Sequence, residues 1–406
     1  MKIRALTGFL DPGFPVDARR IKTITSCLQT CKEMLQDSGY EVQTLRIATP
    51  PPAEMEEPVP PNQRADFARQ LEAESFVNAI DYAAVGPALP DELDGYTVIP
   101  NILGATEIIF TSGLFADPEN GISLSAARAC ARAILETSLL KDDGFSNLRF
   151  ASLANVSPGT PFFPAAYHRG GNTAIAIATE SADLAVESLL EARSLSIARR
   201  RLVSVIENHA ASMQGIAERV TAKHETQFLG IDFSMAPFPE EARSIGSALE
   251  TLGIPTVGLS GTAAGVAFLA DCLDRAQFKR TGFCGMFLPV LEDLVLAASA
   301  AKKAISINAL LLYATLCGTG LDTIPLPGDV SAEAISAVLL DLGAVALRHN
   351  KPLTARLMPI PESQPGDEIL FDFPYFADSR VMNLPSKPLE GLLAGPEVLY
   401  LGPHLS

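Results

Sequence analysis

The N-terminal part of the chain shows the pattern of a strand, a helix and a second strand. The run IRALTGFL at residues 3–10 is apolar and ends at the turn sequence DPG. Residues 21–38 carry apolar side chains at helical spacing and are followed by Gly39, and residues 40–49 alternate between polar and apolar positions. Two strands joined by a covering helix predict a right-handed parallel β-α-β unit.

The same succession of strand-like and helix-like segments continues along most of the chain. Further strands are predicted at residues 81–86, 150–155, 174–180, 228–237, 255–259, 354–361 and 368–374. Further helices are predicted at 65–79, 123–140, 181–226, 240–252 and 295–314. This alternation indicates an α/β architecture with a mostly parallel sheet or barrel. We expect one large domain over residues 1–406, with a proline-rich, acidic connector at 50–61 inside it.

Composition narrows the function classes. Hydrophobic residues make up 48% of the 406 positions and charged residues 19%, which is enough for a large core. The net charge of −16 repels phosphate backbones, so we expect no nucleic-acid partner. The six cysteines form no CxxC pair and we expect reduced thiols in a cytoplasm. Glu292 and Asp293 interrupt the apolar run 290–301, so we expect no membrane span.

Two loops hold the first candidate site residues. Ligands of α/β folds bind beyond the C-terminal ends of the strands, so polar residues that follow strand-like runs are candidates. His168 and Arg169 lie in PFFPAAYHRGGN, where the histidine can act as acid, base or metal ligand, or simply bond to backbone. Asp232 lies inside the apolar run FLGIDFSMAP, so its carboxylate must be paired, metal-bound or protonated; a helix cap or a strand-end ion pair is the alternative.

Residues 281–293, TGFCGMFLPVLED, form a third candidate loop. Cys284 lies between glycines and is either an exposed nucleophile or a small apolar filler. Glu292 and Asp293 either carry chemistry or cap the following helix. Arg356, in TARLMPIP, cannot lose its charge and must face an acid or an anionic ligand, a structural ion pair being the alternative.

Residues 316–329, LCGTGLDTIPLPGD, have the composition of a tight turn rich in glycine and proline. Gly318 and Gly320 precede Asp322 directly and indicate a constrained backbone that can approach a ligand. Asp329 stands before a helical segment and is a candidate N-cap. The stretch lacks both the Gly-Lys-Ser/Thr ending of a phosphate loop and the full dinucleotide fingerprint.

Together these segments resemble the domain of unknown function 711 family, also called uncharacterised protein family 0210. The resemblance covers nearly the whole chain and depends on the order of the segments MKIRALT, PFFPAAYH, GIDFSMAPFP at 230–239, GLSGTAAG at 258–265, GFCGMFLPVLED at 282–293, CGTGLDTIPLPGD through ISAVLLDLGA at 317–344, and TARLMPIPESQPGDEI at 354–369.

The resemblance implies a fold of the pyruvate formate-lyase-like type. Such folds are ten-stranded α/β barrels, built from two parallel half-barrels packed antiparallel with helices outside, and a loop enters the lumen. The GFCG segment is the expected loop. The Cys284 position is commonly serine in the family, which argues against an essential thiol. Arg380-Val381 is not followed by Gly-Tyr, so no glycyl radical is expected.

These observations predict an enzyme that acts on a small polar or anionic metabolite in the barrel lumen by lyase-type or hydrolase-type acid/base chemistry. His168, Glu292 and Asp322 are the expected catalytic residues. The expected substrate-binding residues are Arg169, Asp232, Arg356, Gly318, Gly320 and Cys284. Asp232, Asp293 and Asp329 are candidate oxygen ligands for Mg²⁺ or Ca²⁺. A non-catalytic metabolite-binding regulator with the same cavity is the alternative, and we expect a homo-oligomer.

Overall fold

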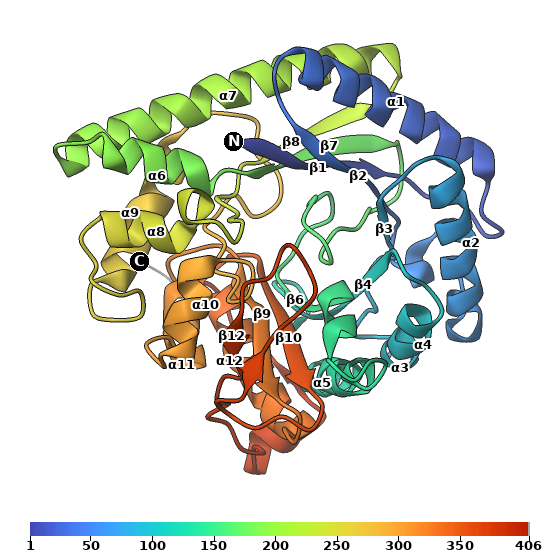
Figure 1. Ribbon diagram of the computed structural model, residues 1–406. Coiled ribbons are helices and arrows are strands. Elements are labelled where there is room, and N and C mark those ends of the chain that lie inside the picture. The colour runs from blue at the N-terminus through green and yellow to red at the C-terminus, as the bar shows by residue number, and fades with distance from the viewer. Residues whose placement is uncertain (405–406) are drawn as a thin grey trace.

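The N-terminal half of the chain builds five parallel strands. In the computed structural model, which describes residues 1–404, they pair in the order β1 (Lys2–Phe9), β2 (Val42–Ala48), β3 (Tyr82–Ala84), β4 (Ile109–Asp117) and β6 (Phe150–Ala154). Their outer side is covered by α1 (Ala18–Asp37), α2 (Arg64–Val77), α3 (Asp94–Thr97), α4 (Ile99–Gly104) and α5 (Leu124–Ser138) (Figure 1). The predicted β-α-β unit is confirmed, because β1 and β2 pair in parallel across α1.

The second half of the chain adds strands that run the opposite way. β7 (Ala174–Glu180) pairs in parallel with β8 (Gln227–Asp232), and β9 (Gly320–Pro327) with β10 (Leu353–Ile360). β7 joins β1 antiparallel, with Lys2 opposite Glu180, and β10 joins β6 antiparallel, with Leu353 opposite Ala154. The C-terminal ends of the strands in one half therefore lie beside the N-terminal ends of the strands in the other.

Residues 280–289 lie between β8 and β9 and contact both. Isolated parallel bridges join Ile231 to Arg280, Met235 to Met286, and Pro289 to Asp322. The segment around Asp322 is not the predicted turn but the strand β9, whose eight residues are all buried. Gly320 has φ +93°, and a Cβ there would lie 2.4 Å from the carbonyl oxygen of Thr354. That glycine thus permits close strand packing.

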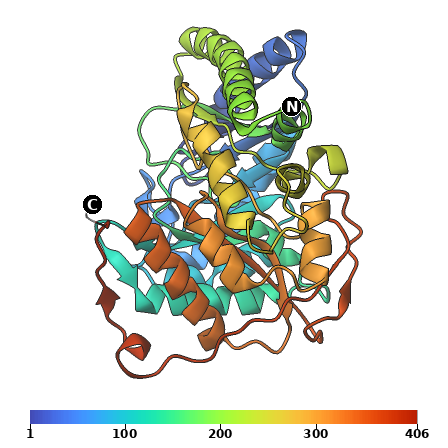
Figure 2. The ribbon, with the colours of Figure 1, turned by 90° about the vertical axis from the view of Figure 1, so that its left-hand side faces the viewer.

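The helices of the second half cover the outer side of its strands (Figure 2). They are α6 (Ala182–Leu190), α7 (Leu195–Lys223), α8 (Ile245–Thr251), α9 (Thr262–Arg275), α10 (Leu294–Ala301), α11 (Ile307–Ala314) and α12 (Ala332–His349). The prediction of one helix over residues 295–314 is wrong, because a new helix begins after Ser306, whose side chain caps α11. Residues 255–259 form turns rather than a strand.

Short elements complete the described chain. Of the predicted strand 368–374 only β11 (Glu368–Ile369) forms, and it pairs with β12 (Ser379–Arg380). β5 (Gly121–Ser123) pairs with β4 and with β13 (Val398–Leu399). The 3₁₀ turns are η1 (Pro52–Glu54), η2 (Pro61–Gln63), η3 (Phe145–Arg149), η4 (Glu241–Arg243) and η5 (Gly391–Ala394). Within residues 1–404, no helix has both the length and the apolar character needed to cross a membrane.

The connection between β6 and β7 fills part of the interior. Phe162 and Tyr167 pack in one apolar cluster with Leu153 of β6, while Phe163 and Ala166 pack in another with side chains of β1, β2 and β3. Figure 1 shows this green loop on the inner side of the curved sheet. The GFCG segment was expected to be the loop that enters the interior. Its backbone runs alongside β8 and β9 instead, while Phe283 and Phe287 pack in the same cluster as Phe162.

Candidate functional site

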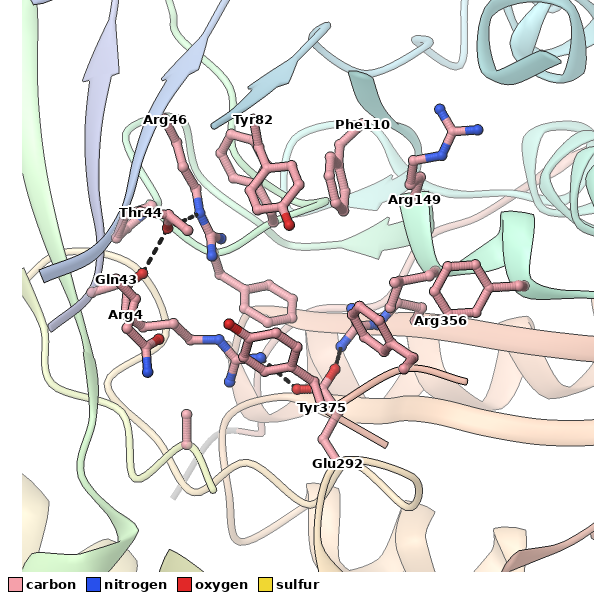
Figure 3. A pocket seen from close by; sticks show the side chains of 18 of the residues that line it. Arg4, Gln43, Thr44, Arg46, Tyr82, Phe110, Arg149, Glu292, Arg356 and Tyr375 are labelled. Atoms are coloured by element: carbon pink, nitrogen blue, oxygen red, sulfur yellow. Dashed lines mark hydrogen bonds and ion pairs between the residues drawn. The ribbon is translucent and has the colours of Figure 1, made fainter. Parts of the chain in front are cut away.

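A cavity of about 550 Å³ lies at one end of the space that the strands surround. Its walls include residues near the starts of β1 and β3, such as Arg4 and Tyr82, with Arg46 farther along β2 (Figure 3). Residues near the ends of β7 and β8, such as Thr179 and Asp232, line it from the other half of the chain. This combination follows from the antiparallel arrangement of the two halves. Arg356 of β10 and aromatic side chains complete the lining.

Two arginines and two carboxylates form a buried network at this end. Arg356 donates from Nη2 to Glu292 Oε1 and from Nε to Asp322 Oδ1, each at 2.6 Å. Arg4 donates from Nη2 to the other oxygen of Glu292 at 2.5 Å. Glu292 and Arg356 line the cavity, and Asp322 lies outside the lining. Arg356 therefore forms the ion pair that was the alternative to ligand binding. Glu292 and Asp322 lie close together, as expected, because both contact Arg356.

The two carboxyl groups of the network have opposite pKa shifts. Burial alone would raise the pKa of Glu292, but the guanidinium groups of Arg356 and Arg4 outweigh it and hold that pKa below its usual value. Burial raises the pKa of Asp322, and Arg356 offsets it only in part because Glu292 repels a second negative charge. Within the described residues, Asp322 Oδ2 is buried without a hydrogen-bond partner.

Asp232 is a second carboxyl group of the cavity wall. It accepts hydrogen bonds from the Ser234 hydroxyl at 2.5 Å and from the backbone N–H groups of Phe283 and Cys284 at 3.0 and 2.9 Å. Burial nevertheless raises its pKa above the usual aspartate value. Asp232 is the last residue of β8, which ends five residues earlier than the strand predicted over 228–237. It holds its proton to higher pH than an exposed aspartate would.

Arg46 is a cation of the cavity wall that lacks a carboxylate partner. Its Nε donates to Thr44 Oγ1 at 2.8 Å, and its guanidinium lies 5.1 Å from the ring centre of Phe163 and 5.5 Å from that of Tyr82. Among residues 1–404, neither Nη of Arg46 has a protein acceptor, and Nη1 of Arg4 is buried without one. Burial, with repulsion from Arg4, lowers the pKa of Arg46 to about 10. The arrangement leaves donors for an anion.

His168 and Arg169 do not line this cavity. The backbone N–H of His168 donates to the carbonyl oxygen of Thr49, just beyond β2, and its ring lies 6.3 Å from that of Phe9 at the end of β1. Burial lowers the pKa of His168, although Asp11 and a backbone hydrogen bond to Gly171 oppose this. Arg169 is exposed. Both residues follow β6, whose C-terminal end lies at the opposite end of the interior.

The three candidate metal ligands have different surroundings. Asp293 caps α8 and α10 together, because its carboxylate accepts from the Ser244 hydroxyl and from four backbone N–H groups, those of Ile245, Gly246, Val295 and Leu296. Asp329 is exposed, and Ser331 rather than Asp329 caps α12. Within residues 1–404, no three His, Cys, Asp or Glu side chains cluster in a way that could hold a metal ion.

The remaining candidates, Cys284, Gly318 and Gly320, have structural contacts. Cys284 has φ +43°, its thiol lies 3.3 Å from the carbonyl oxygens of Ile231 and Thr281, and burial and the nearby Asp232 raise its pKa to about 12. Such a thiol is a poor nucleophile at neutral pH. Gly318 packs against Gly285, where a Cβ would lie 2.8 Å from the Gly318 nitrogen. Neither Cys284 nor the two candidate glycines, Gly318 and Gly320, line the cavity.

Arg4 and Arg46 line the cavity but are absent from the site residues predicted from sequence, although the sequence contains a signal for them. Both are arginines inside strand-like runs, IRALTGFL and TLRIAT, and the reasoning that singled out Arg356 applies to them equally. Tyr82 lies at the start of the short strand β3 and carried no comparable signal. The aromatic lining residues are visible as a group only in the folded chain.

Comparison with known proteins places most of the chain in one family. The family model described as "Uncharacterised ACR (DUF711)" matches residues 1–375. A UPF0210 protein of Pyrobaculum arsenaticum is 30% identical over 389 residues, which cover 89% of this chain and 81% of that protein. UPF0210 proteins of Clostridium perfringens and Desulfovibrio desulfuricans are 25% and 26% identical and cover 86% and 88% of this chain, and 81% and 83% of their own lengths. The chain therefore belongs to the DUF711 family, whose curated members carry the name UPF0210.

Proposed function

We propose that the protein is an enzyme that binds a small anionic metabolite in the 550 Å³ cavity and acts on it by acid/base chemistry. One observation carries the proposal: the partly buried guanidinium of Arg46 faces the cavity with no protein carboxylate to neutralise it. A desolvated charge without a partner is costly, so its retention favours a ligand of opposite charge. A carboxylate or phosphate matches the planar donor fork of arginine.

The charges around Arg46 support an anion rather than a cation. Arg4 and Arg356 share Glu292, and Arg356 also pairs with Asp322, so these four groups neutralise one another. Arg46 then remains as a surplus positive charge beside them. Repulsion from Arg4 contributes to the low pKa of Arg46, and a bound anion would relieve that repulsion.

The cavity also offers two carboxyl groups with unequal proton affinity. Asp232 keeps its proton to higher pH than usual, and Glu292 stays ionised to lower pH than usual. Because their pKa values are shifted in opposite directions, one group suits the role of proton donor and the other that of ionised partner at the same site. Asp232 takes the acid role that the sequence suggested for His168. The reaction proposed is of lyase or hydrolase type and not a glycyl-radical reaction.

The proposal includes a closed barrel of the pyruvate formate-lyase-like type. Two antiparallel sets of parallel strands support it, as do the bridges that link residues 280–289 to β8 on one side and to β9 on the other. If residues 280–289 count as the missing strand, each half has five strands and the cavity is the barrel lumen. The expected result is that residues 280–289 pair continuously with β8 and β9, with backbone amides that exchange as slowly as those of the neighbouring strands.

The test is a titration of the purified protein with sodium acetate, sodium citrate and inorganic phosphate at constant ionic strength. We expect a rise in the unfolding temperature with at least one of these anions, since a ligand that binds only the folded state stabilises it. Arg46→Gln should weaken that anion about 10- to 100-fold, as expected for the loss of about 1.5–3 kcal/mol of charged hydrogen bonds. Arg169→Gln, at an exposed arginine, is the matched control and should bind normally.

Equal affinity of Arg46→Gln and wild type for every anion would contradict the proposal. The alternative function, a metabolite-binding regulator, uses the same cavity and predicts the same titration. Product analysis by mass spectrometry separates the two: an enzyme converts its ligand and loses turnover, but not binding, in Asp232→Asn, whereas a regulator returns the ligand unchanged.

A further inference from the structure

We propose that the metabolite is a monocarboxylate that carries an aromatic or similarly planar ring. This inference rests on the proposed function, because it assigns the substrate class of the same cavity. It starts from a feature that anion binding leaves unexplained, namely the concentration of aromatic side chains around Arg46 and across the cavity from it. Figure 3 shows Tyr82 and Phe110 on one side of the hollow and Tyr375 on the other.

The first aromatic wall adjoins the anion donors directly. The ring centres of Tyr82 and Phe110 are 5.3 Å apart, and those of Phe110 and Phe163 are 5.4 Å apart, both pairs edge to face. The Arg46 guanidinium stacks on Tyr82 and Phe163, the outer two of these rings. A carboxylate held by the Nη groups of Arg46 therefore places the rest of its molecule beside Tyr82 and Phe110.

The second aromatic wall comes from a distant part of the chain. Phe373 and Tyr375 lie between β11 and β12, with ring centres 5.2 Å apart, and line the cavity. Phe373 packs on Phe145 of η3 at 5.1 Å and on the buried Phe376 at 5.2 Å. These contacts hold the second wall in place without any contribution from the first, so the space between the walls is preformed.

The size and charge of the cavity select the class of ligand. A volume of about 550 Å³ lies in the range of pockets that enclose whole organic ligands, and a two-carbon acid would fill a small part of it. Arg149 also lines the cavity, but its guanidinium already donates to three backbone carbonyl oxygens. These bonds leave the charge of Arg149 in place but occupy its donors, so the free Nη donors of Arg46 are the ones left for a ligand. They match one planar carboxylate, which favours a carboxylate over a phosphate dianion. Flat rings gain edge and face contacts with such walls that a saturated ring of equal size does not.

Matched probes test this inference by calorimetric titration of the full chain. We expect 3-phenylpropanoate to bind at least 5-fold more tightly than its saturated counterpart 3-cyclohexylpropanoate, and at least 10-fold more tightly than acetate. Phenyl phosphate should bind more weakly than 3-phenylpropanoate. Phe110→Leu should bring the affinities for the phenyl and cyclohexyl acids together, with the affinity for acetate unchanged. Phe76→Leu, at an exposed phenylalanine of α2, is the control and should keep the preference.

The outcomes separate this inference from the proposed function. Arg46-dependent anion binding with equal affinity for the phenyl and cyclohexyl acids would overturn the inference and leave the proposed function standing. Binding of no anion at all would overturn both. Should Phe110→Leu fail to fold, the comparison of the two acids on wild type still decides. An unchanged preference in folded Phe110→Leu would also overturn the inference.

Discussion

The two ends of the interior contain similar polar residues but leave them in different states. At the cavity end, Arg46 and Asp232 face an open volume, and Arg46 has donors with no protein partner among the described residues. At the opposite end, His168 bonds through its backbone to Thr49, and both oxygens of Asp11 accept backbone N–H groups, those of Gly13 and Glu56. Among the described residues the ring Nε2 of His168 is also buried without a partner, but neither His168 nor Asp11 lines the cavity. Location just after a strand is common to both ends, so it does not identify a ligand site. Space and unfilled bonding capacity together do.

The largest expected effect on stability comes from a substitution that breaks the charge network at the cavity end. Arg356→Met removes the cation between Glu292 and Asp322 and leaves Asp322 buried without its partner. We expect the free energy of unfolding to fall by about 3–5 kcal/mol, measured by urea denaturation. The double variant with Asp322→Asn should recover part of this loss, because it removes one of the stranded charges.

Arg169→Met tests whether the first effect depends on the buried network. Arg169 is exposed and near the other end, and we expect a change within about 0.5 kcal/mol. Equal stability of the Arg356 and Arg169 variants would contradict the energetic difference between the two ends.

A smaller effect concerns the pH dependence contributed by Asp232. Its pKa is raised by burial, so between the unfolded value near 3.8 and the raised folded value the native protein binds more protons than the unfolded chain. The stability that this group contributes is fully present below pH 3.8 and is lost as pH rises through the folded pKa. Each tenfold difference in proton affinity between the folded and unfolded states corresponds to about 1.4 kcal/mol. Relative to Asp232→Asn, wild type should therefore lose stability with rising pH.

Urea denaturation of both proteins from pH 4 to 8 measures this difference. Cys284→Ser is the control from the same cluster, because burial raises the pKa of that thiol to about 12 and it stays protonated throughout this range. Wild-type and Asp232→Asn curves that run parallel would show that Asp232 does not titrate as its surroundings indicate.

The smallest expected effect on anion binding comes from a substitution at the opposite end. His168→Ala removes a buried ring and should lower stability by about 1–3 kcal/mol, yet change the affinity for the anion that binds wild type less than about 2-fold. The affinity is measured by calorimetry below the unfolding transition. Loss of anion binding in a folded His168→Ala protein would show that His168 contributes to the binding site and would contradict the assignment of the site to the cavity end.

Several features of the fold follow from local pattern. The β1-α1-β2 unit is visible in the spacing of apolar residues, and α1 ends before Gly39, which has φ +89°. The helix-capping interpretation of Asp293 also follows from its position before a helical run, and the structure bears it out. Strand β9 escaped prediction because its one glycine and two prolines resemble a turn, and only its burial between residues 280–289 and β10 makes it a strand.

The sequence by itself determined elements with clear periodicity, such as β1, α1 and β2, and the chemical need of particular side chains. A charge such as that of Arg356 inside an apolar run requires a partner wherever the strand lies, because desolvating it is costly. Only the tertiary structure decided which partners meet, since β1 and β7 run antiparallel through hydrogen bonds between residues far apart in the chain. That direction separates His168 from Asp232 and brings Arg46 to the cavity, and no local spacing of residues encodes it.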